Sequence, residues 1–258
     1  MQAGCQGCRS EAQTFDLAMA FQPIVDMTTG LPFAYEALVR GPERQGAAEV
    51  LAAVTPENRY AFDQQCRVAA IAGAVEAGIL ATGARLSINF LPDAVYSPMA
   101  CIQLTLQTAR ATGFPPERLI FEFTENEEMR DPSHVRRIVE TYGKMGFSTA
   151  IDDFGAGYAG LGLLADLPTD LIKLDMALIR GIDRNPRRRL IVEGIVEITK
   201  SLGVALIAEG IETAAELHAI RQIGIRYAQG YFLAKPGFRS LPSIVVDGPN
   251  IPPFANAA

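Results

Sequence analysis

The sequence predicts an α/β fold, a TIM-like (β/α)8 barrel in which one strand runs antiparallel to the others. Three observations predict it: eight short apolar, β-branched segments, helical patterns between most of them, and a first connection too short for a helix. The 258 residues match the length of one such barrel, and no linker-like run divides the interior. We expect one domain at 15–241, between a flexible N-terminal tail at 1–14 and a C-terminal tail at 242–258.

The candidate strands are bounded by turn residues and lie at 20–25, 33–39, 85–90, 119–123, 148–151, 171–174, 205–208 and 227–233. Strands that alternate with helices favour a mainly parallel sheet, and eight of them favour closure into a barrel. Only residues 26–32, with the turn signal Thr28-Thr29-Gly30, separate the first two strands. These two should therefore form an antiparallel hairpin.

Amphipathic patterns between the strands predict helices at 56–77, 98–112, 132–145, 187–202 and 214–223. Several of these segments end at a glycine, as helices often do. His134, His218, Cys66 and Cys101 fall on such helices, where packing or surface positions are more common than metal ligation.

Charge and composition exclude several classes of partner. The formal net charge of −6 argues against binding of a DNA or RNA polymer, which needs a basic face. The start of the chain lacks a signal pattern and no apolar run could span a bilayer, so we expect a cytoplasmic protein without a membrane anchor. Cys5 and Cys8 form a C-x-x-C without a second pair, which favours two thiols on a tail and leaves a redox or metal role open.

Polar residues gather at the carboxyl ends of the predicted strands: Glu36, Asn89, Glu122, Asp152 with Asp153, Lys173 with Asp175, and Glu209. These ends meet at one rim of a barrel, where active sites are built. Any one of these acids alone could equally be salt-bridged or exposed on a loop. Together they would repel one another strongly, and divalent cations are the usual solution. Oxygen ligands without Cys or His suit Mg²⁺ or Mn²⁺ better than zinc.

The spacing of these residues indicates a site with two metal ions. The adjacent Asp152 and Asp153 can bridge two ions, the standard device for phosphodiester hydrolysis. Lys173 is placed to orient or help deprotonate the attacking water. Glu36 shares a strand face with Leu38 and Arg40. The glycine-rich segment 153–157 is either an ordinary loop or one that closes over the substrate, and its position directly after the acid pair favours closure.

Eight motifs in order resemble those of the EAL-domain cyclic di-GMP phosphodiesterase family, and the resemblance spans residues 18–235. They are Gln22-Pro23-Ile24-Val25-Asp26, Glu36-Ala37-Leu38-Val39-Arg40, Ser87-Ile88-Asn89-Phe90, Phe121-Glu122-Phe123-Thr124-Glu125, Asp152-Asp153-Phe154-Gly155, Ile172-Lys173-Leu174-Asp175, Ala208-Glu209-Gly210-Ile211-Glu212 and Gln229-Gly230. The resemblance implies hydrolysis of cyclic di-GMP to linear 5′-pGpG with two Mg²⁺ or Mn²⁺ ions, and a homodimer.

The resemblance also implies roles for individual residues. One ion would be held by Glu36, Asn89, Glu122 and Asp152, and the second by Asp152, Asp153 and Glu209. Lys173 would contact the nucleophilic water, and Glu125 would anchor the loop after the acid pair; with Glu36 and Glu209 these form the expected catalytic set. The dinucleotide would be bound by Gln22, Leu38, Arg40, Asp175, Glu212 and Gln229.

The loop after the acid pair departs from the family pattern, because Ala156, Ala159 and Gly160 replace a threonine and two serines. The lost hydroxyls could loosen the loop or alter coupling within a dimer. The alternatives to a phosphodiesterase are a catalytically silent cyclic di-GMP receptor that acts through a partner protein, and a pure interaction module. Too few residues precede Phe15 for a sensor domain, so regulation is expected from a partner protein, from dimerisation or from expression.

Overall fold

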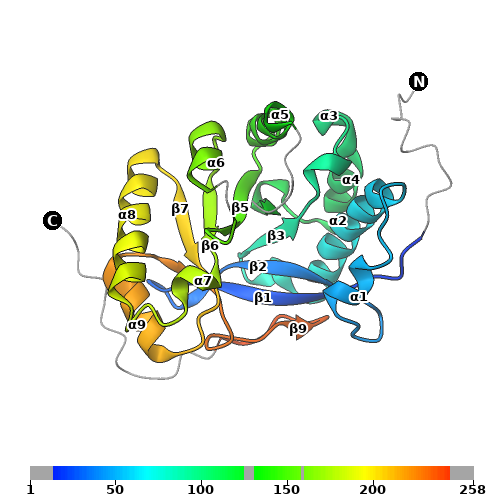
Figure 1. Ribbon diagram of the computed structural model, residues 1–258. Helices are drawn as coiled ribbons and strands as arrows, with labels where there is room; N and C mark the ends of the chain where they lie inside the picture. Colours follow the sequence, from blue (N-terminus) through cyan, green and yellow to red (C-terminus); the bar gives the residue numbers. More distant parts are fainter. Residues whose placement is uncertain (1–13, 125–130, 158–159, 245–258) are drawn as a thin grey trace.

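The computed structural model describes residues 14–124, 131–157 and 160–244 and forms a closed barrel with helices around it (Figure 1). The strands are β1 (Ala18–Asp26), β2 (Leu31–Arg40), β3 (Arg85–Asn89), β4 (Leu119–Thr124), β5 (Ser148–Phe154), β6 (Leu171–Leu174), β7 (Ala205–Ala208), β8 (Tyr227–Ala228) and β9 (Gly237–Phe238). The predicted tail with Cys5 and Cys8 lies almost entirely outside the described residues.

The helices that follow or connect these strands include five that the sequence pattern predicted, one of them in two parts. They are α1 (Ala47–Leu51), α2 (Arg59–Glu76), α3 (Pro98–Cys101), α4 (Gln103–Thr112), α5 (Pro132–Lys144), α6 (Gly160–Asp166), α7 (Met176–Ile179), α8 (Pro186–Leu202) and α9 (Ala214–Ile223). Short 3₁₀ turns lie at 79–81, 92–94 and 116–118.

The reversed strand is β1, which confirms the predicted fold class. The sheet order is β2-β3-β4-β5-β6-β7-β8-β1-β9, and the pairing of β1 with β2 closes the barrel. The β1 strand is antiparallel to β2, β8 and β9, whereas all other neighbouring pairs are parallel. The hairpin turn uses Gly30, whose φ of 72° favours glycine, and its N–H donates to the Asp26 carbonyl at 2.8 Å.

Among the described residues, four short helices and strands were not predicted, the eighth strand is shorter than predicted, and one predicted helix is divided. The eighth strand stops at Ala228 instead of residue 233, because the chain turns sharply at Gly230, whose carbonyl accepts the N–H groups of Leu233 and Ala234. The predicted helix at 98–112 is divided at Ile102 into α3 and α4. The elements α1, α6, α7 and β9 are too short to give a clear period in the sequence.

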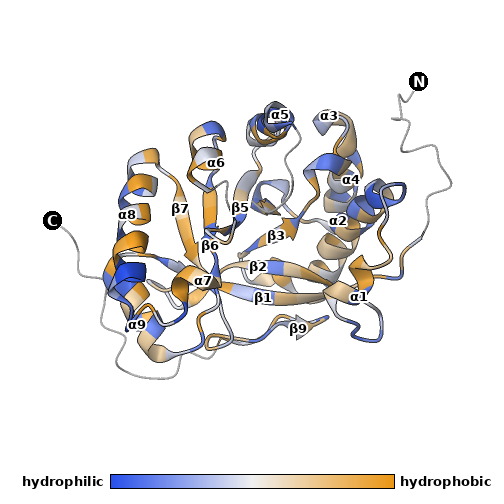
Figure 2. Ribbon diagram, viewed as in Figure 1, coloured by the Kyte–Doolittle hydropathy of each residue, from blue (hydrophilic) through white to orange (hydrophobic). Residues whose placement is uncertain are grey.

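Apolar side chains form two separate layers. The larger lies between the strands and the surrounding helices, and Figure 2 shows β6 and β7 as mostly hydrophobic. The smaller fills the barrel interior near the end where the parallel strands begin, and consists of Ile24, Ala34, Ile120, Ala150, Leu171 and Ile207. This smaller layer fills one end of the barrel interior, and polar residues occupy the opposite end.

Candidate active site

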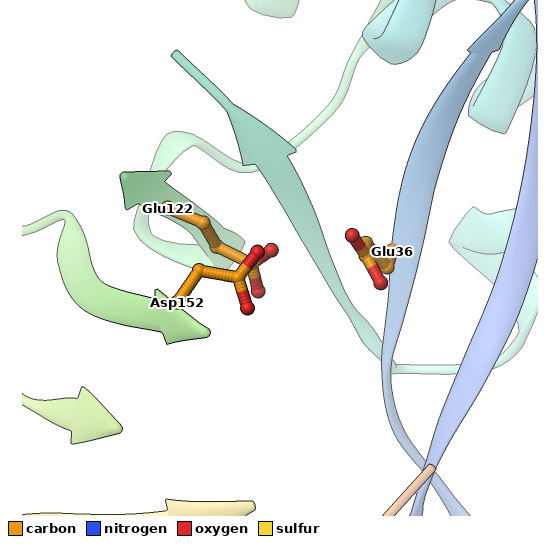
Figure 3. Close-up of side chains that lie close together, drawn as sticks. All are labelled: Glu36, Glu122 and Asp152. Atoms are coloured by element: carbon orange, nitrogen blue, oxygen red, sulfur yellow. The ribbon is translucent and has the colours of Figure 1, made fainter. Parts of the chain in front are cut away.

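Lys173 is the centre of the polar end of the barrel. Its side chain is 1% exposed, and its Nζ lies 2.8 Å from Glu209, 3.0 Å from Asp152, 3.1 Å from Glu122 and 3.4 Å from Glu36. These carboxylates come from β2, β4, β5 and the residue that follows β7. Figure 3 shows Glu36, Glu122 and Asp152 pointing from three strands into one space. The convergence expected of the strand ends is therefore present.

Glu36 is held by amides as well as by the lysine. Gln229 Nε2 donates to Glu36 Oε2 at 2.7 Å, and Asn89 Nδ2 donates to Glu36 Oε1 at 3.1 Å. The same Gln229 amide donates to Gln22 Oε1 at 3.1 Å, and Gln22 donates to the Ala234 carbonyl at 3.1 Å. Gln22 and Gln229, both expected to bind the dinucleotide, are thus linked to the carboxylate cluster.

Strand register explains why these residues face one another. Gln22 pairs with Glu36, Glu36 with Ser87, and Asn89 with Glu122, so their side chains lie on the interior face of the sheet. The Ser87 hydroxyl donates to Glu122 and was given no role by the sequence reasoning. Its position two residues before Asn89 on the same strand was the available signal.

The cluster holds more negative than positive charge. Four carboxylates around one ammonium leave a formal charge of −3 if all are ionised. Burial, together with the charges of Glu36 and Asp152, raises the pKa of Glu122 to about 8 against the opposing Lys173. Burial and the Asp152 charge likewise raise the pKa of Asp153 to about 6. The site therefore favours additional positive charge.

The pKa values of Glu36 and Glu209 shift in opposite directions, although both carboxyls contact Lys173. Burial disfavours ionisation of Glu36, but Lys173 and the two amides outweigh it and lower the pKa of that carboxyl. The Glu209 carboxyl has the opposite result, because burial and the charges of Asp152 and Glu36 outweigh Lys173 and raise its pKa. Burial works against the Lys173 ammonium too, yet the surrounding carboxylates raise its pKa well above the ordinary value.

Two sets of carboxylates in this cluster could each hold a cation. Oxygens of Glu36, Glu122 and Asp152 lie within 4.8 Å of one another, and so do oxygens of Asp152, Asp153 and Glu209. Both sets contain Asp152, as a bridging residue would require. All donors are carboxylate oxygens, which fit Mg²⁺ or Mn²⁺, and the excess negative charge gives such ions a physical reason to bind.

The backbone after the acid pair is shaped to aim both carboxylates. Asp153 has a φ of 54°, uncommon outside glycine although aspartate tolerates it, and its N–H donates to Asp152 Oδ1 at 3.0 Å. Gly155 follows at a φ of 95°, where a Cβ would meet Leu178. The next residue, Ala156, donates its N–H to the Asp153 carbonyl at 3.0 Å. The turn is compact up to this point, and Ala159 lies outside the described residues.

The expected substrate-binding residues lie around two cavities and a strand end. Glu212 borders a cavity of about 250 Å³ together with Gln22, Glu36, Glu209 and Gln229. Leu38 and Asn89 border a second cavity, of about 360 Å³ and mainly apolar.

Two expected substrate-binding residues among the described ones, Arg40 and Asp175, border neither cavity. Arg40 ends β2 and donates to the Val39 carbonyl at 2.7 Å. Asp175 caps α7 by accepting the Ala177 N–H at 2.7 Å. Glu125 lies outside the described residues, so its proposed role in anchoring the loop stays a prediction.

Three further residues border the smaller cavity without having been singled out in the sequence: Met176, Arg180 and Tyr231. Arg180 forms an ion pair with Glu212 at the cavity mouth. Met176 and Tyr231 are exposed there, at 44% and 59%. All three follow motif residues closely, but α7 is a single turn and Tyr231 follows the end of β8, so no sequence period indicated which way these residues face.

Gly230 has no room for a side chain, because a Cβ would overlap the backbone of Ile211. We expect Gly230→Ala to reduce the free energy of unfolding by about 1–3 kcal/mol, the usual cost of overpacking, and to displace Gln229. Gly194→Ala is the control, because that helical glycine has nothing within 4 Å and the change should stabilise by about 0.5–1 kcal/mol. Urea denaturation measures both; equal stability of the two variants would contradict the close approach.

The chain is thus a TIM-like barrel protein with a candidate divalent-cation site. The site consists of the two carboxylate sets and the buried lysine at the carboxyl rim of the barrel. The family model of the EAL domain matches residues 9–236. The chain belongs to the EAL domain family.

Two solved structures show the same fold. A standalone EAL protein of Vibrio cholerae in its c-di-GMP-bound form has a TM-score of 0.86 and 48% identity, over 90% of this chain and 97% of that one. BlrP1 of Klebsiella pneumoniae, in a complex with manganese and cyclic di-GMP, has a TM-score of 0.80 and 33% identity, over 87% of this chain and 57% of that one.

Curated relatives carry two kinds of name. A cyclic di-GMP phosphodiesterase of Pseudomonas aeruginosa is 30% identical over 84% of this chain and 38% of its own length. The blue light- and temperature-regulated antirepressor BluF of Escherichia coli is 31% identical over 87% of this chain and 55% of its own length. The chain thus spans roughly a third to a half of these relatives.

Proposed function

We propose that the chain hydrolyses cyclic di-GMP to linear 5′-pGpG, with two Mg²⁺ or Mn²⁺ ions as cofactors. The observation that carries this proposal is the pair of carboxylate sets that share Asp152 around Lys173. The similarity to phosphodiesterases and to a barrel bound to manganese and cyclic di-GMP supports the choice of substrate and cations.

In this proposal, one ion would be held by Glu36, Asn89, Glu122 and Asp152, and the other by Asp152, Asp153 and Glu209. Two such cations, when bound, supply an activated water and offset the charge that develops on the phosphoryl group. Water oxygen bonds to phosphorus, the bond from phosphorus to the 3′ oxygen breaks, and the ring opens to a 5′-phosphate.

The chain's own residues would position these reactants. Lys173 presents an ammonium with three N–H donors, which suits it to orient the attacking water. Carboxylates such as Glu36 and Glu209 hold the ammonium in position. Gln22, Gln229 and Glu212 border the adjoining cavity and would hold the dinucleotide there. Arg40 would offer a guanidinium fork to a phosphate at the strand end.

Incubation of the purified protein with cyclic di-GMP and Mn²⁺, with separation of the products, tests the reaction. We expect linear 5′-pGpG to accumulate, and EDTA to stop it until Mn²⁺ is restored, because the carboxylate sets need cations to act. Binding of cyclic di-GMP without any hydrolysis would instead support the silent receptor that acts through a partner protein; the BluF relative is named an antirepressor and not a phosphodiesterase. Hydrolysis that survives EDTA undiminished would contradict the metal mechanism.

The setting of the activity belongs to the same proposal. No helix among residues 14–124, 131–157 and 160–244 has the length and hydrophobicity to cross a bilayer. We propose a homodimer, as the family resemblance implies. A cytoplasmic location and control by a regulatory protein are separate parts of the proposal, expected from the sequence.

A further inference from the structure

A buried ion pair lies behind the strands that carry two of the candidate metal ligands. Asp63 and Arg67 are one turn apart on α2, and Arg67 Nη2 lies 2.8 Å from Asp63 Oδ2. Their side chains are 1% and 0% exposed. Replacing such a pair with well-packed apolar residues is often neutral or stabilising, so stability alone is a weak reason for its presence.

The guanidinium of Arg67 contacts the outer faces of β3 and β4. Its Cζ lies 5.4 Å from the centroid of the Phe90 ring and 5.4 Å from that of Phe121. Phe90 follows Asn89, and Phe121 precedes Glu122. The side chains of Asn89 and Glu122 face the barrel interior. Arg67 also donates to the Tyr142 hydroxyl of α5 at 3.0 Å. The ion pair is therefore packed on the outer side of the barrel, against the residues next to Asn89 and Glu122, two of the proposed metal ligands.

Asp63 makes the contact that reaches Asn89 most directly. The pairing of β3 with β4 ends at Asn89 and Glu122, after which the Phe90 N–H still donates to the Glu122 carbonyl at 2.9 Å. The next N–H, that of Leu91, donates to Asp63 Oδ1 at 3.0 Å. Beyond the end of β3, Asp63 therefore replaces the neighbouring strand as the hydrogen-bond acceptor for the backbone.

Packing leaves this strand end open on one side. The mainly apolar cavity of about 360 Å³ is bordered by Asn89, Phe90 and Leu91 as well as by Asp63. A backbone next to an empty space has room to shift, because no atoms oppose it there. The hydrogen bond from Leu91 to Asp63 then holds the backbone just after Asn89, in addition to the bond from the Phe90 N–H to the Glu122 carbonyl.

We propose that Asp63 is a positioning residue that holds Asn89 in place for cation binding, through the hydrogen bond that it accepts from the Leu91 N–H. This inference rests on the proposed function, because it assigns Asn89 to a cation. It adds a residue that touches neither substrate nor metal. Residues that orient a ligand from behind typically change metal affinity by 10- to 100-fold when they are removed.

Two double variants that differ at position 63 alone test the proposal. Asp63→Leu with Arg67→Met removes the ion pair and the acceptor for Leu91, whereas Asp63→Asn with Arg67→Met removes the charges and keeps an acceptor oxygen. Calorimetric titration with Mn²⁺ in the absence of nucleotide gives the affinity. We expect about a tenfold loss for the leucine variant, at the lower end of the range for such residues, and affinity within about twofold of wild type for the asparagine variant.

Two controls separate positioning from a general loss of structure. Tyr142→Phe removes a hydrogen-bond partner of Arg67 and keeps the bond from Leu91 to Asp63, so it should leave Mn²⁺ affinity unchanged. In an Asn89→Ala background, the leucine and asparagine variants should bind Mn²⁺ equally, because the ligand that Asp63 positions is gone. Urea denaturation checks that each variant is folded.

The outcomes are distinct. A wild-type protein that binds no Mn²⁺ would overturn the proposed function, and this inference with it. A wild-type protein that binds Mn²⁺, with equal affinity in the two double variants, would overturn the inference and leave the proposed function standing. A difference between the two that persists without Asn89 would also overturn it.

Discussion

Replacing Glu36 with glutamine is expected to reduce the rate of cyclic di-GMP hydrolysis by roughly 10³-fold or more, since cations contribute several kcal/mol to such reactions and each 1.36 kcal/mol is tenfold in rate. Glu36 is 6% exposed and contacts Lys173, Asn89 and Gln229. Glutamine keeps the volume, and its single carbonyl oxygen can accept from one of the two amides, so the missing charge is the main change at the site. Rates at saturating Mn²⁺ measure it.

The matched control is Glu193→Gln, a carboxylate of α8 whose side chain is 43% exposed and pairs with Arg189. It should hydrolyse the dinucleotide at the wild-type rate. Turnover by the Glu36 variant within tenfold of wild type would contradict its assignment as a metal ligand. A thermal transition like that of wild type would show that the effect is local, because the substitution removes no core volume.

Replacing Lys173 with methionine should have the largest effect on stability. Its ammonium is the shared partner of four buried carboxylates, and removing one partner of a buried ion pair typically costs about 3–5 kcal/mol. The metal-free variant should therefore unfold at a clearly lower urea concentration. Mn²⁺ should restore much of this loss, because ligand present at 100 times its Kd stabilises by about 2.7 kcal/mol.

The comparison variant is Lys200→Met, since Lys200 is exposed on α8 and no carboxylate partner is recorded for it among the described residues. It should leave both the metal-free stability and the response to Mn²⁺ unchanged. If the metal-free Lys173 variant is as stable as wild type, the lysine does not compensate the cluster. If Mn²⁺ stabilises wild type more than the variant, the cations do not take over that part of its role.

Much of the fold could be predicted because its signals are local. Short apolar, β-branched segments bounded by turn residues located every strand of the barrel, and the short connection at 26–32 was enough to reverse β1. The end of β8 was misplaced because Tyr231, Phe232 and Leu233 continue an apolar run although the chain has turned at Gly230. Gly230 lies close to the backbone of Ile211, 19 positions away, and the local sequence around Gly230 does not indicate this contact.

The site was predictable to the extent that its residues lie at strand ends. Glu122, Asp152 and Lys173 lie near strand ends and meet at the rim as expected, and Glu36 joins them from the middle of the longer strand β2. Asp63 and Arg67 could not be found in this way, because a charged pair one turn apart on a helix has the pattern of an exposed surface pair. Only the packing of α2 against the rings of β3 and β4 shows that it is buried.

The reversed first strand has a consequence for how the protein acquires its site. Gln22 and Gln229 touch although 207 positions separate them, so both flanks of Glu36 are in place only when β8 has joined β1. During synthesis, the first two strands must wait for almost the entire chain, and contacts of such long range form slowly. Cation binding would then depend on the docking of β8, the strand that closes the barrel, and a chain cut short before β8 would carry every candidate metal ligand without an assembled site.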